Sequence, residues 1–164
     1  MMPKSYSKAK GRRNFASFLL LPHQVLRCPN YISLSLIARA LLVDIANQYN
    51  GTNNGDLDAK WSTMKKRGWA SKSTLSKHLE ELIYYGFIIK VQQGGINVGG
   101  KKRPNLFAIT WQSIDKIGFS DGFSEQSEWR VGQVPCNWKV EKLPLYPPKP
   151  KRKSPHEFNR PNKK

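Results

Sequence analysis

The sequence predicts an α+β domain that is mainly helical. Apolar residues recur at helical spacing over residues 33–50 and again over 71–86. Two short segments of alternating polarity, 87–93 and 105–111, follow the second of these helices. At 164 residues the chain is long enough for one domain with a buried core and flanking tails. The expected fold is therefore a small helical core followed by a β-hairpin.

The first part of the chain is expected to be a basic arm that leads into helices. The apolar segment 14–21 suits a strand or an extended chain, and 22–28 suits one or two helical turns that begin at Pro22. The helix at 33–50 has the widest apolar face and is predicted to be central to the core. Its apolar stripe comprises Leu34, Ile37, Leu41, Ile45 and Tyr49.

A pair of helices joined by a tight turn is predicted next. Residues 51–56 are rich in Gly and Asn and predict a turn. Residues 59–68 predict a short helix, and residues 71–86 predict a longer one capped by Ser71. Two helices joined by a turn of three or four residues form the helix-turn-helix unit. The buried side of the longer helix is predicted to comprise Leu75, Leu79, Leu82 and Ile83.

The hairpin completes the predicted fold. A glycine-rich, basic loop at 94–104 separates its two strands, and residues 113–117 suit a further helical turn. A helix-turn-helix unit followed by such a hairpin makes a winged helix-turn-helix fold, in which three helices form the core and the hairpin is the wing.

The helical and strand patterns fade beyond residue 117, where Trp129, Trp138 and Tyr146 stand among Pro and Gly. This part is predicted to be an extended segment laid over the domain. The expected organisation is a basic flexible arm (1–13), the winged helix-turn-helix domain (14–117), the extended aromatic-containing segment (118–146) and a Pro- and Lys-rich tail predicted to be disordered (147–164).

The chain is strongly basic, with 28 Lys and Arg against 11 Asp and Glu and a net charge of +17. Such a balance favours an anionic partner, which can be nucleic acid, an anionic membrane surface or an acidic protein. Much of the excess lies at the ends. Residues 1–13 carry five basic residues and no acid, and residues 139–164 carry nine basic residues and two acids.

Other compositional features exclude several classes of protein. The two cysteines, Cys28 and Cys136, are far apart and do not suggest a disulfide framework or a zinc site. The longest apolar run is too short to span a membrane, and the run at 14–21 lacks the features of a signal peptide. A cytoplasmic, nucleoid-associated protein without a membrane partner is therefore expected.

The start of the helix at 71–86 is the best candidate for contact with DNA. A helix in the major groove needs short polar side chains and cations that reach base edges and phosphates, and its N-terminus offers free amides to a phosphate. The alternative is an ordinary capped helix with a solvated polar face. His78, in the second turn, is expected at the surface or facing DNA. The candidate recognition residues are Ser71, Lys72, Ser73, Thr74, Ser76 and Lys77.

Three further basic groups could contact the DNA backbone, and each could instead serve only for solubility. The residues before the turn would hold phosphates, the loop residues would form the wing contact, and the arm residues would add affinity that does not depend on sequence. These groups are Lys65, Lys66 and Arg67 before the turn, Lys101, Lys102 and Arg103 in the wing loop, and Lys10, Arg12 and Arg13 in the arm.

The residue patterns do not nominate a catalytic site, a metal site or a cofactor site. His23, His78 and His156 have no Cys or carboxylate companions at ligand spacing. Asp56 and Asp58 follow a glycine but lack the remaining oxygen ligands of a calcium loop. The chain is therefore expected to be a binding protein without a cofactor, and not an enzyme.

Several short motifs occur between residues 49 and 115. They are Tyr-Asn-Gly-x-Asn-Asn-Gly at 49–55, Met-Lys-x-Arg-Gly-Trp at 64–69, Ser-Lys-x-Thr-Leu at 71–75, Gly-Phe-Ile at 86–88 and the strand NLFAITWQSID at 105–115. In these motifs the chain resembles helix-turn-helix proteins encoded in proteobacterial genomes, often within phages and integrated mobile elements. The resemblance covers about residues 15–117 and is looser to the winged-helix domains of plasmid and phage replication initiators. It implies winged-helix DNA binding.

The leading hypothesis is a sequence-specific, double-stranded DNA-binding protein that regulates transcription in a bacterium or its mobile elements. One alternative keeps the fold and assigns initiation of phage or plasmid replication at origin repeats, with a partner recruited through the C-terminal segment. Another is a basic RNA-associated or structural protein that uses the winged helix as a scaffold. Regulators of this class commonly bind as dimers. The helix at 33–50 could supply a homodimer contact if part of its face is exposed.

Overall fold

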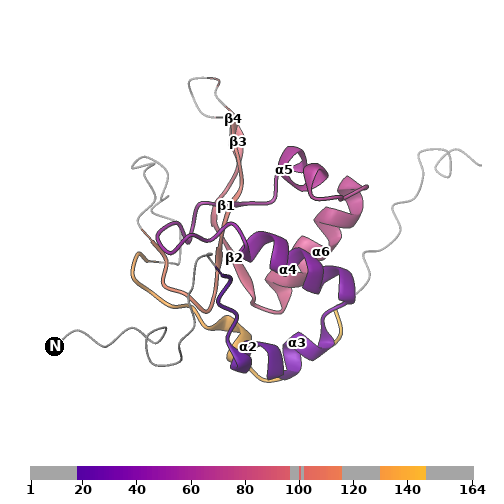
Figure 1. Cartoon of the computed structure of the whole chain (residues 1–164), viewed down its shortest axis with the longest axis vertical. Helices are drawn as coiled ribbons and strands as arrows, with labels where there is room; N and C mark the ends of the chain where they lie inside the picture. Colours follow the sequence, from indigo (N-terminus) through magenta and orange to yellow (C-terminus); the bar gives the residue numbers. More distant parts are fainter. Residues whose placement is uncertain (1–17, 97–99, 101, 116–129, 147–164) are drawn as a thin grey trace, which may run out of the picture.

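The computed structural model describes residues 18–96, 100, 102–115 and 130–146. Within these ranges the chain is α+β, as predicted, with five α-helices and small antiparallel sheets (Figure 1). In chain order the elements are α2 (His23–Arg27), α3 (Pro29–Ser33), α4 (Leu36–Ala46), β1 (Leu57–Asp58), α5 (Trp61–Lys66), α6 (Lys72–Tyr84), β2 (Ile88–Gln92), β3 (Gly95–Ile96), β4 (Lys102–Arg103), β5 (Leu106–Ile109) and the 3-10 helix η1 (Asn137–Lys139).

The prediction of one continuous helix over 33–50 is wrong at both ends. The chain breaks between α3 and α4 because Ser35 is extended, with φ −61° and ψ 152°, and its hydroxyl accepts a hydrogen bond from the Ala38 amide as the N-cap of α4. The shorter helix also shifts the buried stripe. Ile37 is 48% exposed, whereas Ala38, Leu41, Leu42, Ile45 and Ala46 are buried.

The helix predicted over 71–86 is confirmed as α6. Ser71 is its N-cap, with its hydroxyl accepting a hydrogen bond from the Thr74 amide at 3.4 Å. Leu75 and Leu82 are buried as predicted, but Ile83 is exposed. The chain leaves this helix through Gly86, at a φ of +75° that favours glycine.

The strands predicted at 87–93 and 105–111 are confirmed as β2 and β5, which pair antiparallel with Ile88 opposite Ile109. The sheet has a third strand that the sequence did not reveal, because β1 is only two residues long. It pairs with β5 and gives the order β1-β5-β2. Strands β3 and β4 continue the hairpin as a separate two-stranded ribbon, which projects beyond the sheet (Figure 1).

Two short predicted elements differ from the structure. Residues 18–21 of the apolar segment 14–21 form no strand, although Leu19 and Leu21 pack against the core, and residues 14–17 lie outside the described ranges. The helical turn predicted at 113–117 is absent from its described part, residues 113–115. The Ile114 amide instead donates a hydrogen bond to the Gln133 carbonyl, so this part of the chain pairs with residues further along.

Residues 130–146, called the C-terminal strap below, lie against the helical core. Trp138 is only 6% exposed and belongs to the same apolar cluster as Leu41 and Leu82. Asn30 in α3 is fully buried and fastens the strap. Its side-chain amide donates to the carbonyls of Trp138 and Val140, and its carbonyl oxygen accepts from the Leu143 amide at 2.9 Å.

Candidate nucleic-acid interface

The start of α6 presents an exposed polar surface while its other side is held in the core. Leu75 and Leu82 are buried on the inner side. Ser71 and Thr74 are half-buried, and the Ser71 hydroxyl also lies 2.8 Å from that of Ser73. The remaining predicted recognition residues are exposed, namely Lys72, Ser73, Ser76 and Lys77. The first two turns of α6 therefore combine hydroxyls and ammonium groups on one accessible surface.

The cations before the turn divide into two kinds. Lys65 and Lys66 are exposed in the last turn of α5. Arg67 instead pairs with Asp44 of α4, with Nη1 and Oδ1 3.1 Å apart. The other oxygen of Asp44 accepts a hydrogen bond from Trp69 Nε1 at 2.9 Å. Asp44 thus ties the turn between α5 and α6 to α4, and Arg67 has a structural partner in addition to any phosphate contact.

The predicted wing and arm contacts are described only in part. Lys102 and Arg103 are exposed in β4, in the ribbon that projects from the sheet (Figure 1). Lys101 lies outside the described residues, as do Lys10, Arg12 and Arg13 of the arm. The described part of the candidate interface therefore consists of α6, the end of α5 and the β3–β4 ribbon.

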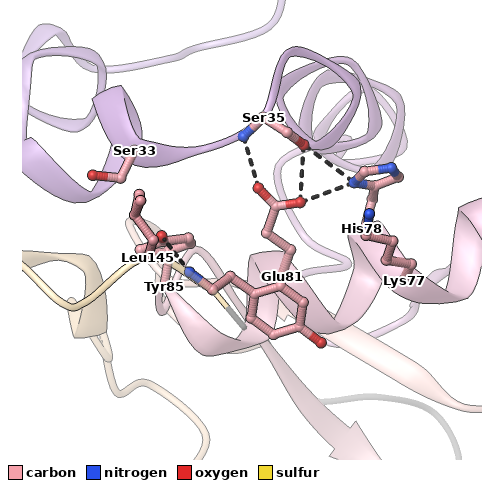
Figure 2. Close-up of a pocket in the computed structure, with 8 residues that line it drawn as sticks. Ser33, Ser35, Lys77, His78, Glu81, Tyr85 and Leu145 are labelled. Carbon is pink, nitrogen blue, oxygen red and sulfur yellow. Dashed lines mark hydrogen bonds and ion pairs between the residues drawn. The ribbon is translucent and has the colours of Figure 1, made fainter. Parts of the chain in front are cut away.

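A buried polar cluster that the sequence did not reveal fixes α6 against α4 (Figure 2). Glu81 of α6 accepts hydrogen bonds from the Ser35 amide at 2.7 Å and from the Ser35 hydroxyl at 2.9 Å. His78 Nδ1 lies 2.9 Å from the same carboxylate and 3.1 Å from the Ser35 hydroxyl. The expectation that His78 lies at the surface or faces DNA is wrong, because its side chain is only 5% exposed.

Helical spacing could have identified His78 as an inward residue. It stands three residues after Leu75 and four before Leu82, on the stripe that faces the core. A carboxylate on the next turn then supplies the buried imidazole with a hydrogen-bond partner. The partner from α4 could not be found in this way, since Ser35 is 46 residues away in sequence from Glu81.

The Glu81 carboxyl titrates below its ordinary range. Burial of the carboxyl raises its pKa, but hydrogen bonds from the Ser35 amide, from His78 and from the Ser35 hydroxyl, with the charge of His78, outweigh burial and lower the pKa overall. An ionised carboxylate only accepts hydrogen bonds, so Nδ1 of His78 carries the hydrogen of its bond to Glu81. Side chains of α6 thus hold Ser35, which is the N-cap of α4.

The Ser, His and Glu of this cluster do not have the geometry of a catalytic triad. In such a triad the serine hydroxyl bonds one imidazole nitrogen and the carboxylate bonds the other. Here the Ser35 hydroxyl and Glu81 both face Nδ1, and Ser35 Oγ also accepts from the Ala38 amide. The adjoining cavity of about 290 Å³ is bordered by Lys77, Tyr85 and Tyr146 as well. The chemistry of the cluster is that of a structural link between two helices.

Replacing Glu81 by glutamine is expected to lower the free energy of unfolding by about 1–3 kcal/mol at neutral pH, because a buried charged acceptor is lost. The pKa of this carboxyl is lower in the folded than in the unfolded protein, so its contribution is present above the ordinary pKa of 4.5 and is lost as pH falls through the folded pKa. Urea unfolding of both proteins over an acidic pH series checks this.

Glu141→Gln is the matched control, since that side chain is exposed on the strap. The control is expected to change stability little at any pH. A difference between the Glu81→Gln variant and the unsubstituted protein that stays constant from neutral to strongly acidic pH would contradict the assignment.

Among residues 18–96, 100, 102–115 and 130–146 there is no group of three or more His, Cys, Asp and Glu side chains that could hold a metal ion. In the same part of the chain, no helix has the length and apolar character required to cross a membrane.

Comparisons of this chain with protein-family models, with curated proteins and with solved structures found no match.

Proposed function

We propose that this chain is a winged helix-turn-helix protein that binds double-stranded DNA in a sequence-specific manner, with α6 as the recognition helix. The order of elements supports this proposal, because the helix pair α5 and α6 is followed directly by a hairpin whose tip extends as a ribbon. The hairpin and the helix pair would meet the same duplex, the helix in the major groove and the ribbon along the backbone.

The observation that carries the proposal is the contrast between the two sides of α6. On one side, hydroxyl and ammonium groups stand exposed within the first two turns, at the end of the helix where free amides and the dipole attract a phosphate. On the other side, Leu75, Leu82 and the Glu81 cluster hold the helix in place. A rigid helix with an exposed hydrogen-bonding start is what direct readout of bases requires.

Exposed cations on both neighbours of α6 support a duplex as the ligand. Lys65 and Lys66 precede the helix, and Lys102 and Arg103 stand on the ribbon that follows it. In the proposed complex these groups contact phosphates and fix the register of α6 in the groove. The remaining cations of the arm and the C-terminal tail would add affinity without sequence preference.

The biological role proposed is transcription regulation in the cytoplasm of a bacterium or in one of its mobile elements, in keeping with the resemblance of the motifs at 49–115. Initiation of replication at origin repeats is compatible with the same DNA-binding surface, with a transcription or replication partner held by the C-terminal segment. The two roles differ in the DNA that is bound. A regulator would bind at a promoter, and an initiator would bind repeats beside a replication origin.

Selection of duplexes from a random-sequence pool tests the proposed function. The protein is expected to enrich a short motif that survives washing at elevated salt, since base contacts are less sensitive to salt than phosphate contacts. A folded protein that enriches no motif, or that prefers single-stranded RNA over every duplex, would contradict the proposal and favour the RNA-associated alternative.

A further inference from the structure

A tryptophan of α5 contacts the lysine that begins α6. The ammonium of Lys72 lies over the ring of Trp61, 5.9 Å from the ring centroid. Trp61 is the first residue of α5 and Lys72 is the first residue of α6, so the starts of the two helices lie beside each other. An ammonium at such a distance from an indole face is attracted to the ring, and tryptophan attracts cations more strongly than the other aromatic side chains do.

Trp61 is held in place by the core. Its side chain is half-buried and packs against the main apolar cluster, which includes Met64 of the same helix. Lys72 is exposed, and a lysine side chain at the surface ordinarily samples many rotamers. The contact therefore restricts the lysine more than it restricts the tryptophan.

The contact with Trp61 leaves the charge of Lys72 available. Arg67, by comparison, pairs with the carboxylate of Asp44 at 3.1 Å. A carboxylate offsets the charge of its partner and repels a phosphate. The indole ring has no net charge, so the ammonium over it keeps its full charge and its hydrogen-bond donors. These donors can bond a phosphate oxygen while the ring holds the side chain.

The helix dipole does not explain a lysine at this point. A cation in the first turn of a helix faces the positive end of the dipole, which disfavours it. Lys72 therefore adds no stability to α6 through the dipole, although Trp61 is accounted for by its core contacts. An ammonium that is held beside the helix start does, however, strengthen the attraction of this end for an anion.

We propose that Trp61 is a positioning residue, which holds the ammonium of Lys72 where it contacts a phosphate beside the recognition helix. This inference rests on the proposed function, because it concerns a contact of the same DNA-binding surface. The benefit comes from order. A lysine side chain that is already held loses less freedom on binding, so its contact with the phosphate becomes more favourable without an additional contact to DNA.

A double-mutant cycle on the affinity for a selected duplex tests the proposal. Trp61→Leu keeps an apolar side chain against the core but removes the aromatic face, and it is expected to weaken binding about two- to fivefold. The slope of log affinity against log salt should stay unchanged, because the charge of Lys72 remains. Circular dichroism would verify the fold of the variant.

The background of the substitution separates positioning from a general loss of structure. In a Lys72→Ala background, Trp61→Leu should have no further effect on affinity. In a Lys77→Ala background, which is the matched control, it should keep its full effect, because Lys77 lies more than one turn further along α6.

Proton NMR of the unsubstituted chain tests the pair without DNA and without any change to the fold. The methylene protons next to the ammonium of Lys72 should resonate upfield of those of Lys77, since the aromatic ring shields groups that lie over its face. The difference should disappear in Trp61→Leu.

The possible failures are distinguishable. A chain that selects no duplex motif, or a Lys72→Ala variant that binds as tightly as the unsubstituted chain, would contradict the proposed function and the inference with it. The positioning role alone is overturned if Lys72→Ala weakens binding but Trp61→Leu acts equally in the Lys72→Ala and Lys77→Ala backgrounds. It is also overturned if Trp61→Leu tightens binding, or if the methylene protons of the two lysines resonate together.

Discussion

Gly86→Ala is expected to lower the free energy of unfolding by roughly 2–4 kcal/mol, because two separate costs add at this position. The first is conformational, since Gly86 has a φ of +75° and a side chain is disfavoured in that region. The second is steric. A Cβ on Gly86 would lie 2.7 Å from the carbonyl carbon of Asn137 and 2.8 Å from its oxygen. Backbone atoms of the C-terminal strap would have to move away.

Gly68→Ala separates the two costs. Gly68 also has a positive φ, of +94°, but a Cβ there would meet nothing within 4 Å. Its replacement should cost only the conformational share, about 1 kcal/mol. Denaturant unfolding of the two variants, measured side by side, gives the comparison. Equal losses would show that the strap does not press against Gly86 in solution.

The double variant Lys72→Ala, Lys77→Ala is expected to weaken binding to a selected duplex by at least about 30-fold, since each contact to a base contributes about 1–3 kcal/mol and about 1.4 kcal/mol corresponds to a factor of ten. If both ammonium groups contact phosphates, the slope of log affinity against log salt should become shallower by about 1.8. Both side chains are exposed, so the fold should be unaffected. Binding isotherms at several salt concentrations provide both quantities.

Lys139→Ala, Lys142→Ala removes the same charge from the C-terminal strap and serves as the control. Both lysines are exposed, and they stand outside α5, α6 and the β3–β4 ribbon. The control should change affinity far less. If both double variants weaken binding equally, net charge and not the start of α6 governs the interaction.

The sequence predicted the elements whose signals are local. The cap at Ser71 and the buried positions Leu75 and Leu82 lie within one helix, so spacing alone identifies α6. The same reasoning failed at the start of α4. There a leucine-rich pattern continues across Ser35, but α3 ends at Ser33 with Leu34 extended, and the Ser35 side chain caps α4. Capping depends on side-chain hydrogen bonds that an apolar pattern does not record.

Contacts between distant segments could not be predicted. Asn54 belongs to a Gly- and Asn-rich turn and would ordinarily be exposed, yet it is fully buried. Its side-chain amide donates to the Ile109 carbonyl at 2.9 Å, and its oxygen accepts from the Ile109 amide at 2.8 Å, so it closes the end of β5. Asn30 likewise reaches Trp138, which is 108 residues away. A buried amide is recognised only once its partners are known.

In the candidate interface, too, the sequence identified local features of α6 but not its contacts with distant segments. The exposure of Lys72, Ser73, Ser76 and Lys77 follows from the helical periodicity that the sequence displays. The partners that hold the helix, Ser35 on α4 and the strap at Gly86, come from other parts of the chain. Sequence patterns therefore predicted which residues could contact a ligand, while the structure supplies the reason why α6 is held rigidly.

In the proposed complex α6, and not the basic ends of the chain, discriminates between DNA sequences. The direct test is the ratio of affinities for a selected duplex and a scrambled duplex of equal length. It is measured on the full chain after every Lys and Arg within 1–13 and 147–164 has been replaced by glutamine. We expect weaker binding to both duplexes and an unchanged ratio, because the neutralised residues would contact only phosphates. A ratio that falls to one would contradict this expectation.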